Sequence, residues 1–212
     1  MKRFTLFIFL FALSEFVIGQ IYTADKKFEY DIKYFQSQGN QSSHERIILT
    51  MTGKKWKVDE SQLEGIWTYF TKPKTEKKFK KQKSNRVLKE ATTGVIENEK
   101  KNWLHSPRHN QYFLTEISPF PDFRKNLKVG ESYNTILFIG KGFGDFTDKK
   151  IKFKYVIKSS EVHSTDTLWT IEATSIIDEK TNSCNFIFSE KRGFIWLDYN
   201  FYNGDKLLMQ LR

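Results

Sequence analysis

The sequence predicts an all-β protein, built as a single curved antiparallel sheet or as a half-barrel or sandwich of about ten strands. Short runs in which apolar and polar residues alternate recur along the chain, with turn residues between them and no convincing helical period. The composition agrees, because the 212 residues include 20 Phe, 9 Tyr and 5 Trp, and aromatic side chains favour strands.

The N-terminus has the layout of a signal peptide for export. Met1-Lys2-Arg3 is followed by an apolar run, Phe4–Leu13, which is shorter than the about 20 residues that a membrane-spanning helix needs. We expect cleavage ahead of Gln20, so that residues 1–19 are the signal peptide and 20–212 form a single β domain. The mature protein is then expected in the periplasm or outside the cell, with no transmembrane segment.

Cysteine content and charge limit the possible partners. Cys184 is the only cysteine, so an internal disulfide is excluded, and its strand-like context predicts a buried structural thiol. The net charge of +10 favours anionic partners such as lipid headgroups, lipopolysaccharide or acidic glycans. Nucleic acid fits the charge but not the expected location, so it is not expected as a partner.

The first strands are predicted from alternation. Phe28, Tyr30, Ile32 and Tyr34 alternate with charged residues, which indicates a half-buried strand. The strands expected in this part of the chain are residues 28–34, 46–52, 56–58 and 66–71, with a turn at Thr52–Lys55 and with Trp56 and Val58 on one face.

A lysine-rich run, Lys72–Lys89, follows. It contains nine basic residues and one acidic residue, Glu76. One interpretation is a solvated edge strand and loop, where lysines prevent edge-to-edge pairing. The other is an arm that faces an anionic surface, and Lys78 and Lys81 are its candidate contacts to a headgroup.

Prolines punctuate the central part of the chain. Residues 93–98 and 103–105 are expected to be two short strands around a tight bend. Pro107, Pro119 and Pro121 force the residues before them out of helical geometry. We therefore expect Tyr112–Ile117, which lies between these prolines, to be one extended strand.

The C-terminal half is predicted to consist of hairpins. Gly140–Asp145 resembles a phosphate-binding loop, but such a loop needs a following helix and a strand follows here, so a hairpin is expected. Asn203-Gly204 predicts another tight hairpin. The expected strands are residues 133–139, 149–158, 167–177, 185–189, 194–201 and 206–211.

One box, Trp103-Leu104-His105-Ser106-Pro107-Arg108, is the most specific motif, and it is accompanied by Thr93–Asn98, Tyr112-Phe113, Pro119–Pro121, Leu127–Gly130 and Gly193–Tyr199. On these residues the chain resembles an uncharacterised family of exported proteins from Gram-negative bacteria, with Ser106 where a second proline is expected. This resemblance implies no activity. At the level of fold alone, the C-terminal strands are similar to periplasmic lipoprotein-carrier half-barrels, which implies a curved sheet around an apolar cavity.

Catalytic and metal sites are not expected. His105 and His109 have a spacing that suits a helix face, but Pro107 precludes a helix there, so no metal ligand set is assigned. We expect His105 and Arg108 to anchor a turn through hydrogen bonds to backbone carbonyls, Glu97 or Glu116. No nucleophile motif or carboxylate pair stands out, so neither an enzyme nor a cofactor is predicted.

Three function hypotheses follow. The first is a non-enzymatic envelope protein that binds or carries an anionic amphiphile, with apolar groups among the aromatic residues and lysines at the headgroup. The second is a structural or interaction protein with a filled core that docks on an envelope protein. The third is an enzyme with a site around His105, Arg108 and Glu97. The candidate ligand-binding residues are Trp67, Trp103, His105, Arg108, Lys78 and Lys81.

Overall fold

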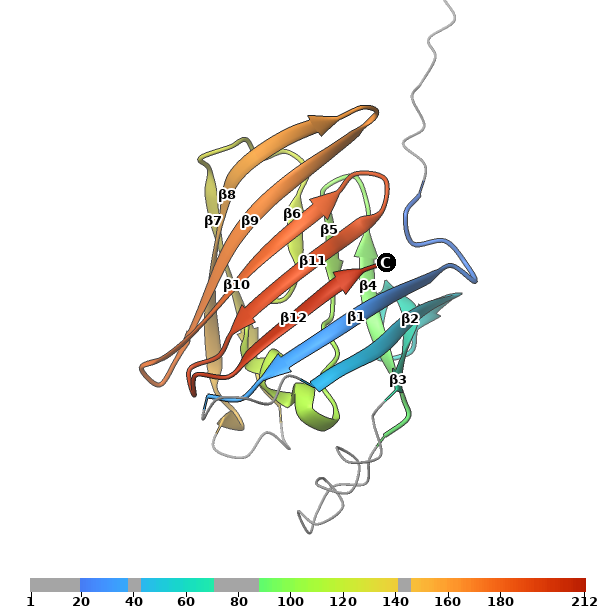
Figure 1. Ribbon diagram of the computed structural model, residues 1–212. Coiled ribbons are helices and arrows are strands. Elements are labelled where there is room, and N and C mark those ends of the chain that lie inside the picture. The colour runs from blue at the N-terminus through green and yellow to red at the C-terminus, as the bar shows by residue number, and fades with distance from the viewer. Residues whose placement is uncertain (1–19, 38–42, 71–87, 141–145) are drawn as a thin grey trace, which may run out of the picture.

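The computed structural model describes residues 20–37, 43–70, 88–140 and 146–212, without the side chains of residues 43 and 44. These residues contain twelve strands, where about ten are expected, in one antiparallel sheet that curls into the predicted half-barrel (Figure 1). The elements in chain order are β1 (Lys27–Phe35), β2 (Ser43–Trp56), β3 (Asp59–Phe70), β4 (Glu90–Glu97), β5 (Lys101–Leu104), the 3-10 helix η1 (Asn110–Ile117), β6 (Asp122–Arg124), β7 (Ser132–Phe138), β8 (Lys150–His163), β9 (Asp166–Ile177), β10 (Lys180–Ser189), β11 (Gly193–Asn200) and β12 (Lys206–Leu211).

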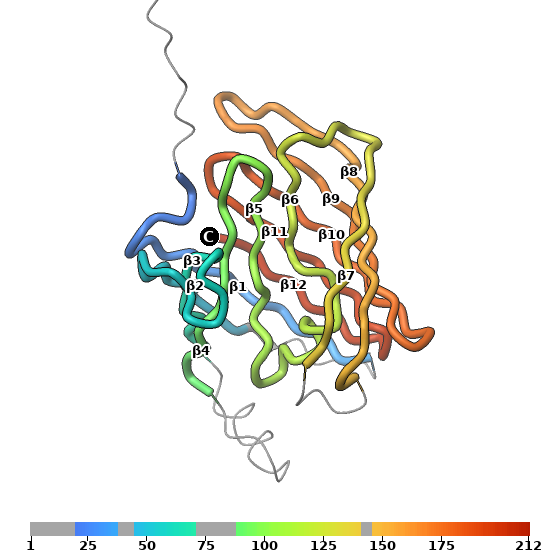
Figure 2. Tube along the Cα trace, turned by 180° about the vertical axis from the view of Figure 1, so that it is seen from behind, coloured from blue at the N-terminus to red at the C-terminus, as the bar shows by residue number. Residues whose placement is uncertain are grey.

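The strand order explains the curled shape. It runs β6-β5-β4-β3-β2-β1-β12-β11-β10-β9-β8-β7, so every neighbouring pair is consecutive in the chain except β1 and β12. The two edge strands, β6 and β7, are also consecutive, and Figure 2 shows them next to each other. The Tyr133 hydroxyl on β7 donates to the Asp122 carbonyl on β6 at 2.8 Å, which links the two edges of the sheet.

The core lies on the concave face of the sheet. On β1 the alternating residues Phe28, Tyr30, Ile32 and Tyr34 are all buried, and the same alternation fills the inner faces of the other long strands. Cys184 on β10 belongs to this core and is a buried free thiol, as predicted. No helix among the described residues is long and apolar enough to span a membrane.

The predicted turn at Thr52–Lys55 is wrong, because β2 continues through it to Trp56. The register of β2 against β3 shifts between Met51 and Lys55, and Gly53 takes a positive φ of 73°. A glycine in this conformation serves a bulge as readily as a turn. Consequently Trp56 ends β2 as a buried residue, whereas Val58 lies in the following turn and is 77% exposed.

The segment before β1 packs against the sheet. The Glu97 carboxylate accepts hydrogen bonds from the backbone N–H groups of Ile21 and Tyr22, each at 2.8 Å, and both side chains are buried. Residues 1–19, for which a signal peptide is predicted, lie outside the described residues, as do residues 71–87 of the lysine-rich run and loop residues 141–145.

The hairpins of the C-terminal half agree with prediction. Strands β7 to β12 pair in sequence order, and the chain reverses between β11 and β12 at Asn203-Gly204. Of these two residues only Gly204 takes a positive φ, of 83°.

Gly53→Val is expected to lower the free energy of unfolding by about 1–3 kcal/mol, because a β-branched residue is strained at positive φ. An added Cβ would also lie 2.7 Å from the Ala24 Cβ. Urea unfolding measures the loss. The matched control is Gly140→Val, since a Cβ at Gly140 meets nothing within 4 Å; equal losses in the two variants would contradict the prediction.

Candidate functional site

The Trp-Leu-His-x-Pro-Arg box leads into a segment that packs against the concave face of the half-barrel. We call His105–Pro121 the crossing segment. Its apolar side chains Tyr112, Leu114 and Ile117 belong to the same buried cluster as the inner faces of the strands. The interior of the half-barrel therefore contains part of the chain itself.

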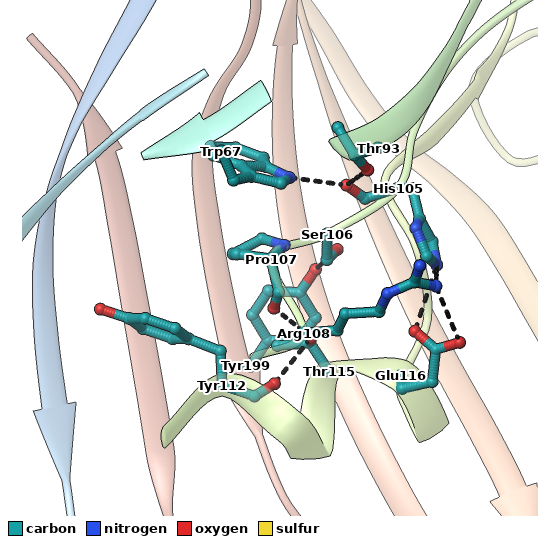
Figure 3. A network of polar contacts seen from close by, with 10 residues as sticks. All are labelled: Trp67, Thr93, His105, Ser106, Pro107, Arg108, Tyr112, Thr115, Glu116 and Tyr199. Atoms are coloured by element: carbon teal, nitrogen blue, oxygen red, sulfur yellow. Dashed lines mark hydrogen bonds and ion pairs between the residues drawn. The ribbon is translucent and has the colours of Figure 1, made fainter. Parts of the chain in front are cut away.

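Apart from η1, the crossing segment has no regular structure, so its buried carbonyls need donors from elsewhere. The strands supply them from inward-facing polar side chains. Trp67 Nε1 on β3 and Thr93 Oγ1 on β4 both donate to the His105 carbonyl at 3.1 Å (Figure 3). These two bonds fix the beginning of the crossing segment against β3 and β4.

The other end of the crossing segment is bound to the opposite side of the half-barrel. Ser175 on β9 and Asn182 on β10 donate to the Ile117 carbonyl at 2.8 and 3.0 Å. The Tyr155 hydroxyl on β8 donates to the Phe120 carbonyl at 3.0 Å. The segment thus bridges strands that are far apart in the sheet order.

The middle of the segment is held by hydroxyl groups. The Ser106 and Tyr199 hydroxyls share a buried hydrogen bond of 2.7 Å, which joins the segment to β11. Thr115 Oγ1 contacts the carbonyls of Pro107 and Tyr112 at 2.6 and 2.9 Å (Figure 3). This one side chain therefore joins η1 to the start of the crossing segment.

The expected extended strand at Tyr112–Ile117 is wrong, because these residues lie in the 3-10 helix η1. The proline argument holds for Ser118, which precedes Pro119, ends the helix and is extended. His109 at the other end of the helix is also extended, although no proline follows it. Between these two residues the backbone forms local hydrogen bonds, such as that of Ser118 N–H to the Thr115 carbonyl.

The start of η1 is anchored by polar side chains. The Asn110 amide exchanges two hydrogen bonds with the backbone of Leu88, at 2.9 and 3.0 Å. Gln111 and the Tyr112 hydroxyl both donate to Glu45 on β2, a buried carboxylate. The residues at the N-terminal end of the helix are thereby tied to β2 and to the residue that leads into β4.

A polar cluster that contains a histidine, an arginine and a glutamate joins His105, Arg108 and Glu116. His105 Nε2 lies 3.1 Å from Glu116 Oε2, and the Arg108 guanidinium lies 3.5 Å from Glu116 Oε1. Aromatic rings enclose the imidazole: Trp103 stacks on it at 5.7 Å, and the Phe120 ring meets it edge-on at 4.6 Å. Of the partners expected to anchor this turn, which were backbone carbonyls, Glu97 and Glu116, Glu116 is the one that contacts both His105 and Arg108.

Burial alone would raise the pKa of Glu116. The hydrogen bond and charge of His105 and the charge of Arg108 outweigh it and hold the pKa of this carboxyl below its ordinary value of 4.5. Glu116 is thus stabilised as a carboxylate inside the protein.

Four of the six candidate ligand-binding residues come together here. His105 and Arg108 belong to the beginning of the crossing segment, and Trp67 on β3 and Trp103 on β5 contact His105. Lys78 and Lys81 lie outside the described residues. Glu97, the third member of the hypothetical enzyme site, instead binds the backbone of Ile21 and Tyr22.

Sequence reasoning missed the residues that hold the segment in place. A signal was present, because Ser175 alternates with the buried Ala173 and Ile177 on β9, and Asn182 alternates with the buried Cys184 and Phe186 on β10. A polar residue at such a position indicates a buried hydrogen-bond partner. The missed residues are Glu45, Thr93, Tyr155, Ser175, Asn182 and Tyr199.

Chemically, the cluster is held by the contact between His105 Nε2 and Glu116, whereas His105 Nδ1 is buried with no hydrogen-bond partner among the described residues. The His105 and Glu116 side chains are 7% and 9% exposed, and their polar atoms face each other. In the part of the chain that the structure describes, no group of three or more His, Cys, Asp or Glu side chains is arranged to hold a metal ion.

No protein-family model and no curated protein matches the sequence. Among solved structures, the chain is similar to a presumed exported protein with a YmcC-like fold from Bacteroides fragilis, with 7% identity, coverage of 90% of this chain and 97% of that chain, and a TM-score of 0.44. It is also similar to a presumed lipoprotein from Parabacteroides distasonis, with 10% identity, coverage of 91% and 98%, and a TM-score of 0.41. Neither likeness assigns a role to a residue of this chain.

Ser106→Ala and Tyr199→Phe are each expected to lower the free energy of unfolding by about 1–3 kcal/mol, because each leaves one buried hydroxyl without its partner. The double variant should lose less than the sum of the two, since it removes both partners. Denaturant unfolding of the four proteins of this cycle measures the coupling. Strict additivity would mean that this hydrogen bond does not hold the segment.

Glu116→Gln is expected to lower stability at neutral pH by about 1–3 kcal/mol. Because the pKa of Glu116 is depressed in the folded protein, its contribution is complete above the unfolded-state pKa and is lost as the pH falls through the folded-state value. The stability difference from wild type should therefore shrink as the pH is lowered from about 5 to about 3. The control is Glu172→Gln on the surface, for which urea unfolding at each pH should show little difference.

Proposed function

We propose that this protein is a non-enzymatic protein of the cell envelope that binds anionic amphiphiles at its outer surface rather than carrying one inside. The observation that carries the proposal is the crossing segment on the concave face. In a half-barrel carrier that face holds the apolar part of the cargo. Here Tyr112, Leu114 and Ile117 lie among the inward residues of the strands.

Making room for an acyl chain would require the segment to move. That movement would break the bonds of Ser175 and Asn182 to the Ile117 carbonyl and of Trp67 and Thr93 to the His105 carbonyl. Each buried polar group left without a partner costs about 1–3 kcal/mol. The energy needed for several such losses supports binding at the outside of the half-barrel.

Charge and location support the choice of partner. The net charge of +10 favours anionic molecules, and the N-terminal sequence supports export to the envelope. A cut ahead of Gln20 would keep Ile21 and Tyr22 in the mature protein. Both of these residues are buried against the sheet, whereas Gln20 is exposed.

The non-enzymatic part of the proposal rests on the use of the polar residues. His105, Arg108 and Glu116 contact one another, and Glu97 binds the backbone of the N-terminal segment. These contacts support a role for the four side chains in holding the fold together.

A second candidate is a protein that docks on an envelope protein through its sheet edge. The bonds of Ile157 N–H to the Glu131 carbonyl and of Ile139 N–H to the Lys149 carbonyl fix which residues of β7 pair with β8. By alternation, Ile136 and Phe138 direct their backbone groups away from β8. In the described part of the sheet β7 is an edge, so these groups are available for strand addition.

Two experiments test the proposal. Native mass spectrometry of the exported protein, followed by organic extraction, detects a lipid inside the half-barrel. Sedimentation with phosphatidylglycerol vesicles measures binding at the outer surface. We expect a mass without bound lipid, and association with these vesicles at low salt that weakens as salt is added. A stoichiometric lipid in the spectrum would replace the proposal by an internal carrier. An apo mass without vesicle binding would favour the protein-docking candidate.

A further inference from the structure

The outer face of β7, β8 and β9 exposes three large apolar side chains close together. Ile136 and Phe138 on β7 are 66% and 58% exposed, and Ile176 on β9 is 55% exposed. Ile136 lies opposite Lys152 on β8, which in turn lies opposite Ile176. Since neighbouring strands are about 4.8 Å apart, the two isoleucines stand on one row with a single residue between them.

Three lysines share this face with the apolar residues. Lys150, Lys152 and Lys154 are the exposed alternate residues of β8, and they pair with Phe138, Ile136 and Asn134 respectively. We call Ile136, Phe138, Ile176, Lys150, Lys152 and Lys154 the outer patch. Apolar and cationic side chains thus alternate over three adjacent strands.

Two acidic residues near the outer patch, Asp178 and Glu172, are paired with other lysines. Lys149 contacts Asp178 in the turn after β9, and Lys158 lies 3.0 Å from Glu172. Among the residues that the structure describes, Lys150, Lys152 and Lys154 form no ion pair with an acidic side chain. Their charge is therefore available to an external anion.

We propose that the outer patch is the docking surface of this protein for an anionic lipid bilayer. This inference rests on the proposed function and assigns it to particular residues. Ile136, Phe138 and Ile176 enter the interfacial region, while Lys150, Lys152 and Lys154 meet the lipid phosphates around them. Apolar side chains among lysines on one exposed face are the combination that stabilises peripheral proteins on anionic bilayers.

The extent of the outer patch favours a bilayer over a protein strand. A strand added to the open edge of β7 would contact Ile136 and Phe138 but would leave Ile176, two strands further into the sheet, uncovered. A second copy of this chain would bring another set of unpaired lysines to the same place. An extended anionic surface contacts both halves of the outer patch without that repulsion.

The test is sedimentation of the full exported protein with phosphatidylcholine vesicles that contain or lack phosphatidylglycerol. We expect Lys150→Gln/Lys152→Gln/Lys154→Gln to lower binding to the anionic vesicles about a hundredfold, from roughly fivefold per lysine. Ile136→Ser/Phe138→Ser/Ile176→Ser should lower it at least about tenfold. All six side chains are exposed on the sheet surface, and circular dichroism verifies that the variants fold.

Matched controls carry the same changes elsewhere. Lys54, Lys55 and Lys57 are exposed at the end of β2 and in the next turn, and their triple change to Gln gives the same net charge. Val58 and Val162 are 77% and 76% exposed, so Val58→Ser/Val162→Ser removes apolar surface outside the outer patch. Both controls should bind anionic vesicles like wild type.

The possible outcomes separate the two proposals. If wild type binds anionic vesicles and the outer-patch variants bind equally well, the outer patch is not the docking surface, while the proposed function stands. Equal loss in the lysine variant and its control would mean that net charge alone directs binding, which also overturns the outer patch. If wild type binds no anionic vesicle, the proposed function itself fails.

Discussion

The structure depends on one constraint: a stretch of irregular backbone buried against a sheet must find donors for its carbonyls. The crossing segment meets it with side chains from five strands, β3, β4, β8, β9 and β10. Inward-facing positions that pure packing would give to apolar residues are occupied by Thr93, Ser175 and Asn182 for this reason. The core of this protein therefore contains both apolar side chains and buried hydrogen bonds, and the hydrogen bonds determine where the crossing segment lies.

Much of the fold could be predicted because strands carry their own periodicity. The alternation of Phe28, Tyr30, Ile32 and Tyr34 predicts a half-buried strand, and β1 is one. The all-β class, the hairpins of the C-terminal half and the buried Cys184 follow from the same local grounds, whereas the half-barrel shape is implied by the fold-level resemblance. Gly53 shows the limit, because a glycine with positive φ has the same sequence signature in a turn and in a bulge.

The candidate site was predictable only in part, since it is made by contacts across the sheet. That the box from Trp103 to Arg108 forms an anchored turn, with Glu116 among the partners of His105, could be inferred because these residues are close in sequence. The bond of Ser106 to Tyr199 joins residues 93 positions apart, and nothing local indicates it. The 3-10 helix was missed for a related reason: whether Tyr112–Ile117 pairs as a strand depends on a free sheet edge next to it, which is a property of the whole fold.

The pairing of β1 with β12 has a consequence for how the chain folds. Arg212 hydrogen-bonds Asp31 across 181 positions of sequence, and β1 and β12 lie at the centre of the sheet rather than at its edges. The two halves of the sheet are each local meanders, but their union closes a loop that includes nearly the whole chain. Such long-range contacts raise the contact order and slow folding. The sheet cannot be completed until β12 is available, so during synthesis the central edge of the N-terminal half stays unpaired until β12 has been made.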